Sequence, residues 1–168
     1  ATILNPCIIL GAGDWRSGPG RLFSTVDRGL PVYPVGRNGF VGAQDVARAV
    51  VLALAAPEAT GERYILCAES LWYKDFFARV AAALGRRPPR WPLLPALAGP
   101  LGWLAERAAG LVGAPPFLEH EAILASAYDS VYGNAKFREA FGFEYTPIGQ
   151  VIAETAAAYR AAHPREQR

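Results

Sequence analysis

An almost unbroken apolar run near the start of the chain limits its possible folds more than any other feature. Between Ile3 and Leu10, only Asn5 and Pro6 interrupt the apolar residues. A strand with one face in water alternates apolar and polar residues, whereas a strand of a parallel sheet is covered on both faces and is apolar along its length. The run therefore predicts a buried strand of a parallel sheet, with helices on both faces and a neighbouring strand on each side.

Short apolar segments alternate with helical periodicity over the first half of the chain. Extended segments are expected at residues 31–35, 40–41 and 63–67, and helices at residues 21–28, 46–55 and 73–84. Asp45 and Ser70 stand just before two of these helices and are expected to cap them. After Gly85, helices are expected almost exclusively, at residues 96–111, 119–127, 134–141 and 148–162. This order indicates an α/β sheet edge that passes into a helical subdomain.

The composition excludes several classes of protein. Hydrophobic residues make up 52% of the 168 residues and charged residues 19%, which excludes long-range disorder and is enough for one domain with a sizeable core. The formal net charge of +2, from 17 basic and 15 acidic residues, is too balanced for a dedicated nucleic-acid binder. The most apolar stretch, residues 91–105, is shorter than the roughly 20 residues of a membrane span and contains prolines. No export segment is recognised, so a cytoplasmic location is expected.

Too few cysteines and histidines are present to build a metal site. Cys7 and Cys67 each stand in an apolar run and are expected to be buried, inert thiols. His120 and His163 are far apart and lack the spacing of metal ligands. We therefore expect neither a disulfide framework nor a metal centre.

Gly11-Ala-Gly13, after the apolar run, is similar to the start of a dinucleotide-binding fingerprint. That fingerprint needs a third glycine at position 16, where this chain has Arg16, and a helix that begins at once. Residues 17–20, Ser-Gly-Pro-Gly, prevent an immediate helix. The glycines are therefore interpreted as a loop rather than as a phosphate-binding turn.

Taken in order, several segments resemble one known family. Residues 3–14, Ile-Leu-Asn-Pro-Cys-Ile-Ile-Leu-Gly-Ala-Gly-Asp, are similar to the sixth-strand motif of the extended short-chain dehydrogenases/reductases. Residues 36–47 resemble the strand and helix that lead into the substrate domain of these enzymes. The remaining landmarks of the family match, in the right order, Arg63-Tyr-Ile-Leu, Lys74-Asp-Phe-Phe, Asn134-Ala-Lys136 and residues 141–147. Within the family, the resemblance is to the dihydroflavonol-reductase-like and NAD-dependent epimerase/dehydratase group.

The resemblance implies an α/β fold made of the last strands of a Rossmann-type parallel sheet and a mainly helical C-terminal substrate subdomain. Residues 1–162 would form one substrate-binding domain and residues 163–168 a frayed tail, and the N-terminal nucleotide-binding half would be absent. In this family the glycine-rich fingerprint, the acidic ribose ligand and the catalytic Ser/Thr and Tyr-x-x-x-Lys precede the sixth strand. Tyr132 and Lys136 have the Tyr-x-x-x-Lys spacing, but they stand too late in the sequence to be that catalytic pair, and Gly133 between them weakens a helix. We therefore expect no catalytic residue in this chain.

The resemblance also implies where a cofactor would lie. NAD or NADP would meet this chain with its nicotinamide end only, against a wall formed by Pro6 and the backbone of Cys7, Ile8 and Ile9. Proline has a fixed φ and no N–H, and its neighbours offer backbone groups to a carboxamide. The alternative interpretation is a proline that merely ends a strand.

Three residues are candidates for the substrate pocket: Trp15, Asn38 and Phe40. Trp15 follows the glycine-rich loop, where its ring would stack on a planar ligand or else fill the core beneath the loop. Asn38 stands where nucleotide-sugar enzymes of the family often carry an arginine, although Arg37 is adjacent. This difference favours a small or apolar carbonyl compound as the substrate.

These features predict the substrate-binding portion of an NAD(P)-dependent oxidoreductase or epimerase, which acts on a carbonyl or alcohol carbon and is not catalytic by itself. A second hypothesis is a non-enzymatic interaction module that uses an exposed apolar sheet edge, and a third is a small enzyme that uses Tyr132 and Lys136. The expected partners are a small-molecule substrate, the missing nucleotide-binding half and, through residues 3–10, a second copy of the chain. Neither nucleic acid nor a membrane span is expected.

Overall fold

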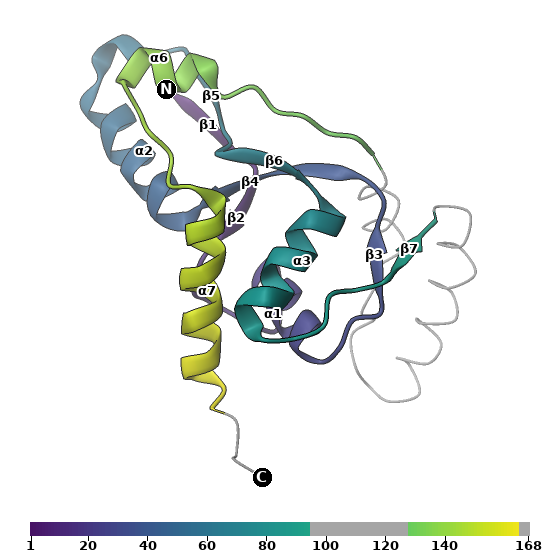
Figure 1. The fold of residues 1–168 in the computed structure, drawn as a ribbon. Coiled ribbons are helices and arrows are strands. Elements are labelled where there is room, and N and C mark those ends of the chain that lie inside the picture. Colours follow the sequence, from purple (N-terminus) through teal and green to yellow (C-terminus); the bar gives the residue numbers. More distant parts are fainter. Residues whose placement is uncertain (95–127, 165–168) are drawn as a thin grey trace.

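The computed structural model describes residues 1–94 and 128–164 (Figure 1). The helices expected at residues 96–111 and 119–127, together with His120, lie outside these residues, as does most of the expected tail. The elements are, in order, β1 (Ile3–Pro6), β2 (Ile8–Leu10), α1 (Gly20–Asp27), β3 (Val32–Pro34), β4 (Arg37–Gly42), α2 (Ala43–Ala55), the short 3-10 helix η1 (Pro57–Ala59), β5 (Arg63–Leu66), β6 (Glu69–Trp72), α3 (Tyr73–Leu84), β7 (Trp91–Leu93), α6 (Ala135–Phe141) and α7 (Ile148–Ala162). Among the described residues, no helix is long and apolar enough to cross a membrane.

The apolar run at the start of the chain forms two strands rather than one, because it changes partners at Cys7. β1 pairs in parallel with β5, in a register that sets Pro6 beside Leu66. β2 pairs in parallel with β4, and β4 pairs in the antiparallel direction with β6. A further parallel pair joins β3 and β7. The predicted α/β fold with parallel strands is confirmed, and the antiparallel β4–β6 pair is an addition to it.

Helices cover these strands and divide the core into two clusters. In the first cluster, α1, α3 and α7 pack around β2 and β4, and the ring of Phe40 stacks on that of Phe76 with centroids 4.3 Å apart. In the second cluster, α2 and α6 cover one face of the β1–β5 pair, where Tyr64 and Phe137 are in edge-to-face contact. Figure 1 shows α2 and α6 at the end of the molecule that carries β1 and β5. The junction between β1 and β2 therefore connects the two clusters.

Within residues 1–94 and 128–164, only one face of the β1–β5 pair is covered. Leu4 and Leu66 pack into the second cluster, whereas Ile3 and Ile65, on the opposite face, are 41% and 38% exposed. Within the described residues, β1 also has no strand beside its second edge. The described residues thus supply one neighbouring strand and one layer of helices for β1, and burial on both faces is not seen among them.

The uncovered strand predicts that the chain associates with itself, because unpaired backbone groups and exposed isoleucines are a template for pairing with another chain. Replacing Ile3 by lysine should abolish the excess light scattering that the unmodified chain shows at micromolar concentration. Ile3 is a better position than Ile8, since Ile8 packs against the first core cluster. Ala153→Lys, at an exposed position of α7, adds the same charge elsewhere and should leave association unchanged. An unmodified chain that is monomeric and binds no hydrophobic dye would contradict the prediction.

Helical periodicity predicted the positions of the described helices closely, but not their caps. α3 and α7 begin and end at the expected residues, and α3 is followed by Gly85, whose φ of +65° suits glycine. Neither predicted side-chain cap is made. Ser70 lies within β6, and Asp45 lies inside the first turn of α2, because β4 continues directly into that helix after Gly42. The Asp45 carboxylate is therefore left for another role.

Candidate functional site

The carboxyl ends of β1 and β5 lie side by side and place Cys7 next to Cys67. Pro6 and Leu66 are the last paired residues of the two strands, and the backbone N–H of Cys7 donates to the Leu66 carbonyl at 3.0 Å. In open α/β sheets, ligands bind outside the carboxyl ends of the parallel strands. This edge is therefore the candidate functional site of the chain.

Gly39 of β4 provides the space that the two sulfur atoms occupy. A Cβ atom at this position would lie 2.6 Å from the Cys7 Sγ, 2.7 Å from the Cys67 Sγ and 2.9 Å from a ring carbon of Tyr132. The two thiols therefore meet against the backbone of β4, with the Tyr132 ring beside them. Cys67 is buried as expected, whereas Cys7 is partly exposed, and the pairing of the two thiols is a feature that sequence reasoning missed.

Hydrogen bonds to its sulfur make Cys67 the more acidic of the two thiols. The Cys7 thiol is the strongest influence, and together with the Ser70 hydroxyl and the backbone amide of Phe40 it lowers the pKa of Cys67 to about 7, despite burial. The Ser70 Oγ lies 3.8 Å from the Cys67 Sγ. The pKa of Cys7 is raised, first by its hydrogen bond to Cys67 and then by burial. The first proton therefore leaves Cys67, while Cys7 remains a donor to the thiolate.

A buried tyrosine hydroxyl near the same site donates no hydrogen bond to the described residues. The Oη atom of Tyr145 is buried and makes no hydrogen bond within residues 1–94 and 128–164. Burial is the main cause that raises the pKa of Tyr145 to about 12. The backbone N–H of Cys67, which approaches the oxygen, opposes this rise, and the nearby charges of Cys67 and Asp45 add to it. The hydroxyl therefore stays protonated at neutral pH. A buried donor without a partner costs about 1–3 kcal/mol, so Tyr145 is a candidate to donate to a ligand.

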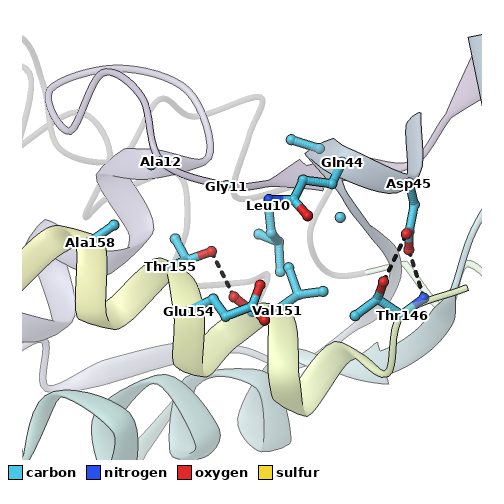
Figure 2. Close-up of a pocket in the computed structure, with 12 residues that line it drawn as sticks. Leu10, Gly11, Ala12, Gln44, Asp45, Thr146, Val151, Glu154, Thr155 and Ala158 are labelled. Atoms are coloured by element: carbon cyan, nitrogen blue, oxygen red, sulfur yellow. Dashed lines mark hydrogen bonds between the residues drawn. The ribbon is translucent and has the colours of Figure 1, made fainter. Parts of the chain in front are cut away.

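A pocket of about 340 Å³ lies between the end of β2, the start of α2 and one side of α7 (Figure 2). Two polar side chains on its α7 wall are already engaged. Thr155 donates to the Val151 carbonyl at 2.7 Å, and Glu154 accepts from Gln150 at 2.8 Å. Since few of its polar groups are free for a ligand, the pocket is the weaker candidate for a binding site.

Asp45, at the edge of this pocket, holds the segment before α7 against α2. Its carboxylate is 1% exposed and accepts hydrogen bonds from the backbone N–H and the hydroxyl of Thr146, both at 2.8 Å (Figure 2). Arg48 donates to the same carboxylate at 2.6 Å. The prediction of a helix cap at Asp45 is therefore wrong, because the side chain joins residues 101 positions apart instead of the first turn of its own helix.

The four predicted cofactor-wall residues are contiguous and span the change from one sheet to the next. Pro6 and Cys7 stand at the candidate site, and Pro6 is exposed. On β2, Ile9 is 37% exposed, whereas Ile8 packs against the first core cluster. The contact of these residues with a nicotinamide ring stays a prediction.

The structure brings two of the three predicted substrate residues together. Asn38 donates to the Tyr73 hydroxyl at 3.3 Å, and the fully buried Phe40 meets the Tyr73 ring edge-on. Trp15 lies in another part of the first cluster, where its ring packs edge-on against that of Tyr159 with centroids 5.2 Å apart. Contact with a substrate stays a prediction for all three residues.

Tyr132 and Lys136 do not share a helix face. Tyr132 precedes α6, and its ring lies beside Gly39. The Lys136 ammonium pairs with the carboxylate of Glu62, Nζ to Oε2 at 2.5 Å, on the surface. The Lys136 ammonium is therefore engaged with Glu62 and does not form a Tyr-x-x-x-Lys pair with Tyr132.

No family model matches the sequence, and neither does any curated protein. Solved structures do match. A nucleoside-diphosphate-sugar epimerase from Pseudomonas aeruginosa is 25% identical, with a TM-score of 0.73 over 96% of this chain and 48% of its own. The human epimerase family protein SDR39U1, solved with NADPH, is 21% identical, with a TM-score of 0.67 over 93% and 48% of the two chains. DesIV, a dTDP-glucose 4,6-dehydratase from Streptomyces venezuelae solved with NAD and TYD, is 15% identical, with a TM-score of 0.62 over 95% and 44%.

This chain has the fold of the NAD-dependent epimerases and dehydratases. The resemblance predicted from the order of the sequence motifs is thus confirmed, and the fold is that of the part of these enzymes that the chain covers. The chain spans about half the length of these solved relatives.

Proposed function

We propose that this chain is the C-terminal, substrate-binding part of an NAD(P)-dependent oxidoreductase or epimerase, with residues 1–162 as one domain. The observation that supports this most is the uncovered face of the β1–β5 pair, because parallel sheets are covered on both faces. A nucleotide-binding half seated beside β1 would cover Ile3 and Ile65, which are 41% and 38% exposed. The chain by itself would not be catalytic.

The residues at the carboxyl ends of β1 and β5 suit the nicotinamide end of such a cofactor. Pro6 and Ile9 offer an exposed apolar surface beside the strand ends, and the Tyr145 hydroxyl, which donates to none of the described residues, offers a donor near them. Two of the similar structures hold NADPH or NAD. NAD(P) would supply hydride transfer to or from a carbonyl or alcohol carbon. The residues of this chain would orient the ring and the substrate and exclude water.

A small or apolar substrate is favoured over a nucleotide sugar. Arg37, the cation next to Asn38, is held by Asp129 in a two-pronged pair, with Nε–Oδ1 and Nη2–Oδ2 distances of 2.7 and 3.1 Å. Its guanidinium also lies over the Trp72 ring, 5.0 Å from the ring centroid. Binding a diphosphate through two parallel hydrogen bonds would require the same guanidinium N–H groups that already bind Asp129. The Arg37 guanidinium is therefore already engaged by Asp129. Asn38 has no charge with which to bind a diphosphate instead.

The proposal predicts weak binding of NADPH by the isolated chain. Titration followed by nicotinamide fluorescence should give a Kd weaker than about 1 mM, because only one end of the cofactor would be in contact. A longer polypeptide that includes the upstream coding sequence should bind at least about tenfold more tightly. Micromolar binding by the isolated chain would contradict the assignment, and so would a longer polypeptide that binds no better.

The alternative of a non-enzymatic interaction module is favoured by a second exposed surface. Along α2, Val51 and Leu54 are 66% and 82% exposed, in addition to the isoleucines of β1 and β5. Under this hypothesis, the longer polypeptide would gain no affinity for NADPH, and the apolar surfaces would bind another protein. The titration therefore separates the two functions.

A further inference from the structure

We propose that Cys7 and Cys67 form a redox-active dithiol site that closes to a disulfide when it meets a peroxide. The inference does not depend on the proposed function, because it rests on groups that lie together in this chain alone. Three observations carry it: the register of the strands, the space around the two sulfurs and the different surroundings of the two thiols.

The strand register places the two cysteines at disulfide spacing. Pro6 and Leu66 are paired in parallel, and Cys7 and Cys67 follow them directly. The hydrogen bond from the Cys7 N–H to the Leu66 carbonyl holds the two segments together at this point. Neighbouring strands are separated by about 4.8 Å, which lies within the range of about 4.4–6.8 Å between the Cα atoms of a disulfide. The typical spacing of paired strands is therefore compatible with a disulfide bond at this position.

The two sulfurs also point toward a common position. Both lie within 3 Å of the place that a Cβ of Gly39 would occupy, at 2.6 and 2.7 Å. Side chains that directed their sulfurs to opposite faces of the sheet would not both approach this one point on β4. Glycine at position 39 is what leaves room for the pair.

The two thiols are suited to different steps of the oxidation. Cys67 is buried and accepts hydrogen bonds from the Cys7 thiol and the Ser70 hydroxyl, so it supplies the thiolate. Cys7 is partly exposed and keeps its proton. A buried thiolate is reached by a small oxidant more easily than by a bulky disulfide compound, and hydrogen peroxide is small.

The chemistry balances with hydrogen peroxide as the oxidant. The Cys67 thiolate attacks one peroxide oxygen, the O–O bond breaks, and the departing hydroxide takes a proton from solvent to leave as water. The sulfur of Cys67 is then a sulfenic acid, having lost two electrons to the peroxide. The Cys7 sulfur next attacks that of Cys67, the S–O bond breaks, and the hydroxide leaves as a second water with the proton of Cys7. Overall, two thiols and one peroxide yield one disulfide and two waters.

The test is peroxide treatment of the full chain at pH 7, followed by denaturation, labelling with N-ethylmaleimide and intact mass measurement. Untreated protein should take two labels. Treated protein should take none, lose two hydrogens as a monomer, yield a peptide pair joined through Cys7 and Cys67, and recover both labels after reduction with dithiothreitol. Two labels after treatment would overturn the proposal, as would a disulfide only between separate chains.

Single variants distinguish the roles of the two cysteines. Cys7→Ser should stop at a sulfenic acid on Cys67, which dimedone traps. Cys67→Ser should lose its remaining thiol at least about tenfold more slowly at pH 7, because an ordinary thiol is only a few per cent ionised there. Equal oxidation rates in the two variants would show that the pair has no special reactivity and would contradict the proposal.

The pH profile provides a readout that packing alone would not change. The oxidation rate of the unmodified chain should rise with an apparent pKa below that of an ordinary thiol, about 8.5, because the hydrogen bonds lower the pKa of Cys67. Ser70→Ala removes one of these donors and should move the profile to higher pH. Ser17→Ala, which removes a serine hydroxyl bonded to Asp14 in the loop after β2, should leave it in place. A profile that does not move in Ser70→Ala would contradict the role assigned to Cys67.

Discussion

Replacing Asp45 with alanine should destabilise the chain by roughly 3 kcal/mol and lower its unfolding temperature by about 10 °C. The carboxylate is 1% exposed and bonds the backbone N–H and the hydroxyl of Thr146. Alanine would leave both donors without their acceptor in a site that water barely enters. Arg48 would lose less, because it is 55% exposed and also donates to the Glu144 carbonyl at 3.0 Å. Most of the lost stability therefore comes from the two unpaired donors of Thr146, which hold the segment before α7 against α2.

Thermal and urea unfolding of three variants would measure this effect. Thr146→Ser keeps both donors and should cost less than about 1.5 kcal/mol. Glu139→Ala removes an exposed carboxylate from α6 and should change the free energy of unfolding by no more than about 0.5 kcal/mol. If Asp45→Ala cost only ~1 kcal/mol, the value of a lost helix cap, the long-range attachment of α7 would contribute little to stability.

The sequence predicted those features that depend on residues near one another in the chain. The periodicity after Pro147 located α7 to the residue, and Gly85 marked the end of α3 because a left-handed residue is needed there. The order of the motifs also indicated the fold class, since each motif spans a few residues of one element. Such local signals do not depend on how distant segments of the chain pack.

Features that depend on which strand lies beside which could not be read in the same way. Asn5 and Pro6 interrupt the apolar run of residues 3–10 just before its change of partner at Cys7, but they do not indicate which strands β1 and β2 pair with. The bond from Thr146 to Asp45 and the meeting of Cys7 with Cys67 join residues far apart in the chain. The register of β1 and β5 would have revealed the thiol pair, since each cysteine directly follows its strand. That register is set by packing, which a single sequence does not display.

Replacing Gly39 with alanine should destabilise the chain by roughly 2–3 kcal/mol, the cost of an overpacked core. The added methyl group would lie 2.6 Å from the Cys7 Sγ, 2.7 Å from the Cys67 Sγ and 2.9 Å from the Tyr132 ring. No one movement relieves all three contacts, because the three atoms belong to three separate segments of the chain. Where space is free, alanine is the better residue in a strand or helix by about 0.5–1 kcal/mol, so crowding alone decides the sign here.

Two comparisons make this prediction specific to the sulfur pair. Gly149→Ala, in the first turn of α7, meets no atom within 4 Å and should stabilise the chain by about 0.5–1 kcal/mol in the same unfolding measurements. In a background where both cysteines are alanine, the cost of Gly39→Ala should fall by at least about 1 kcal/mol, because two of the three crowded atoms are gone. An unchanged cost in that background would place the strain elsewhere on β4 and show that the sulfurs yield easily. The fall in cost is expected because the two sulfurs, not the backbone pairing of β4, are what require glycine at this position.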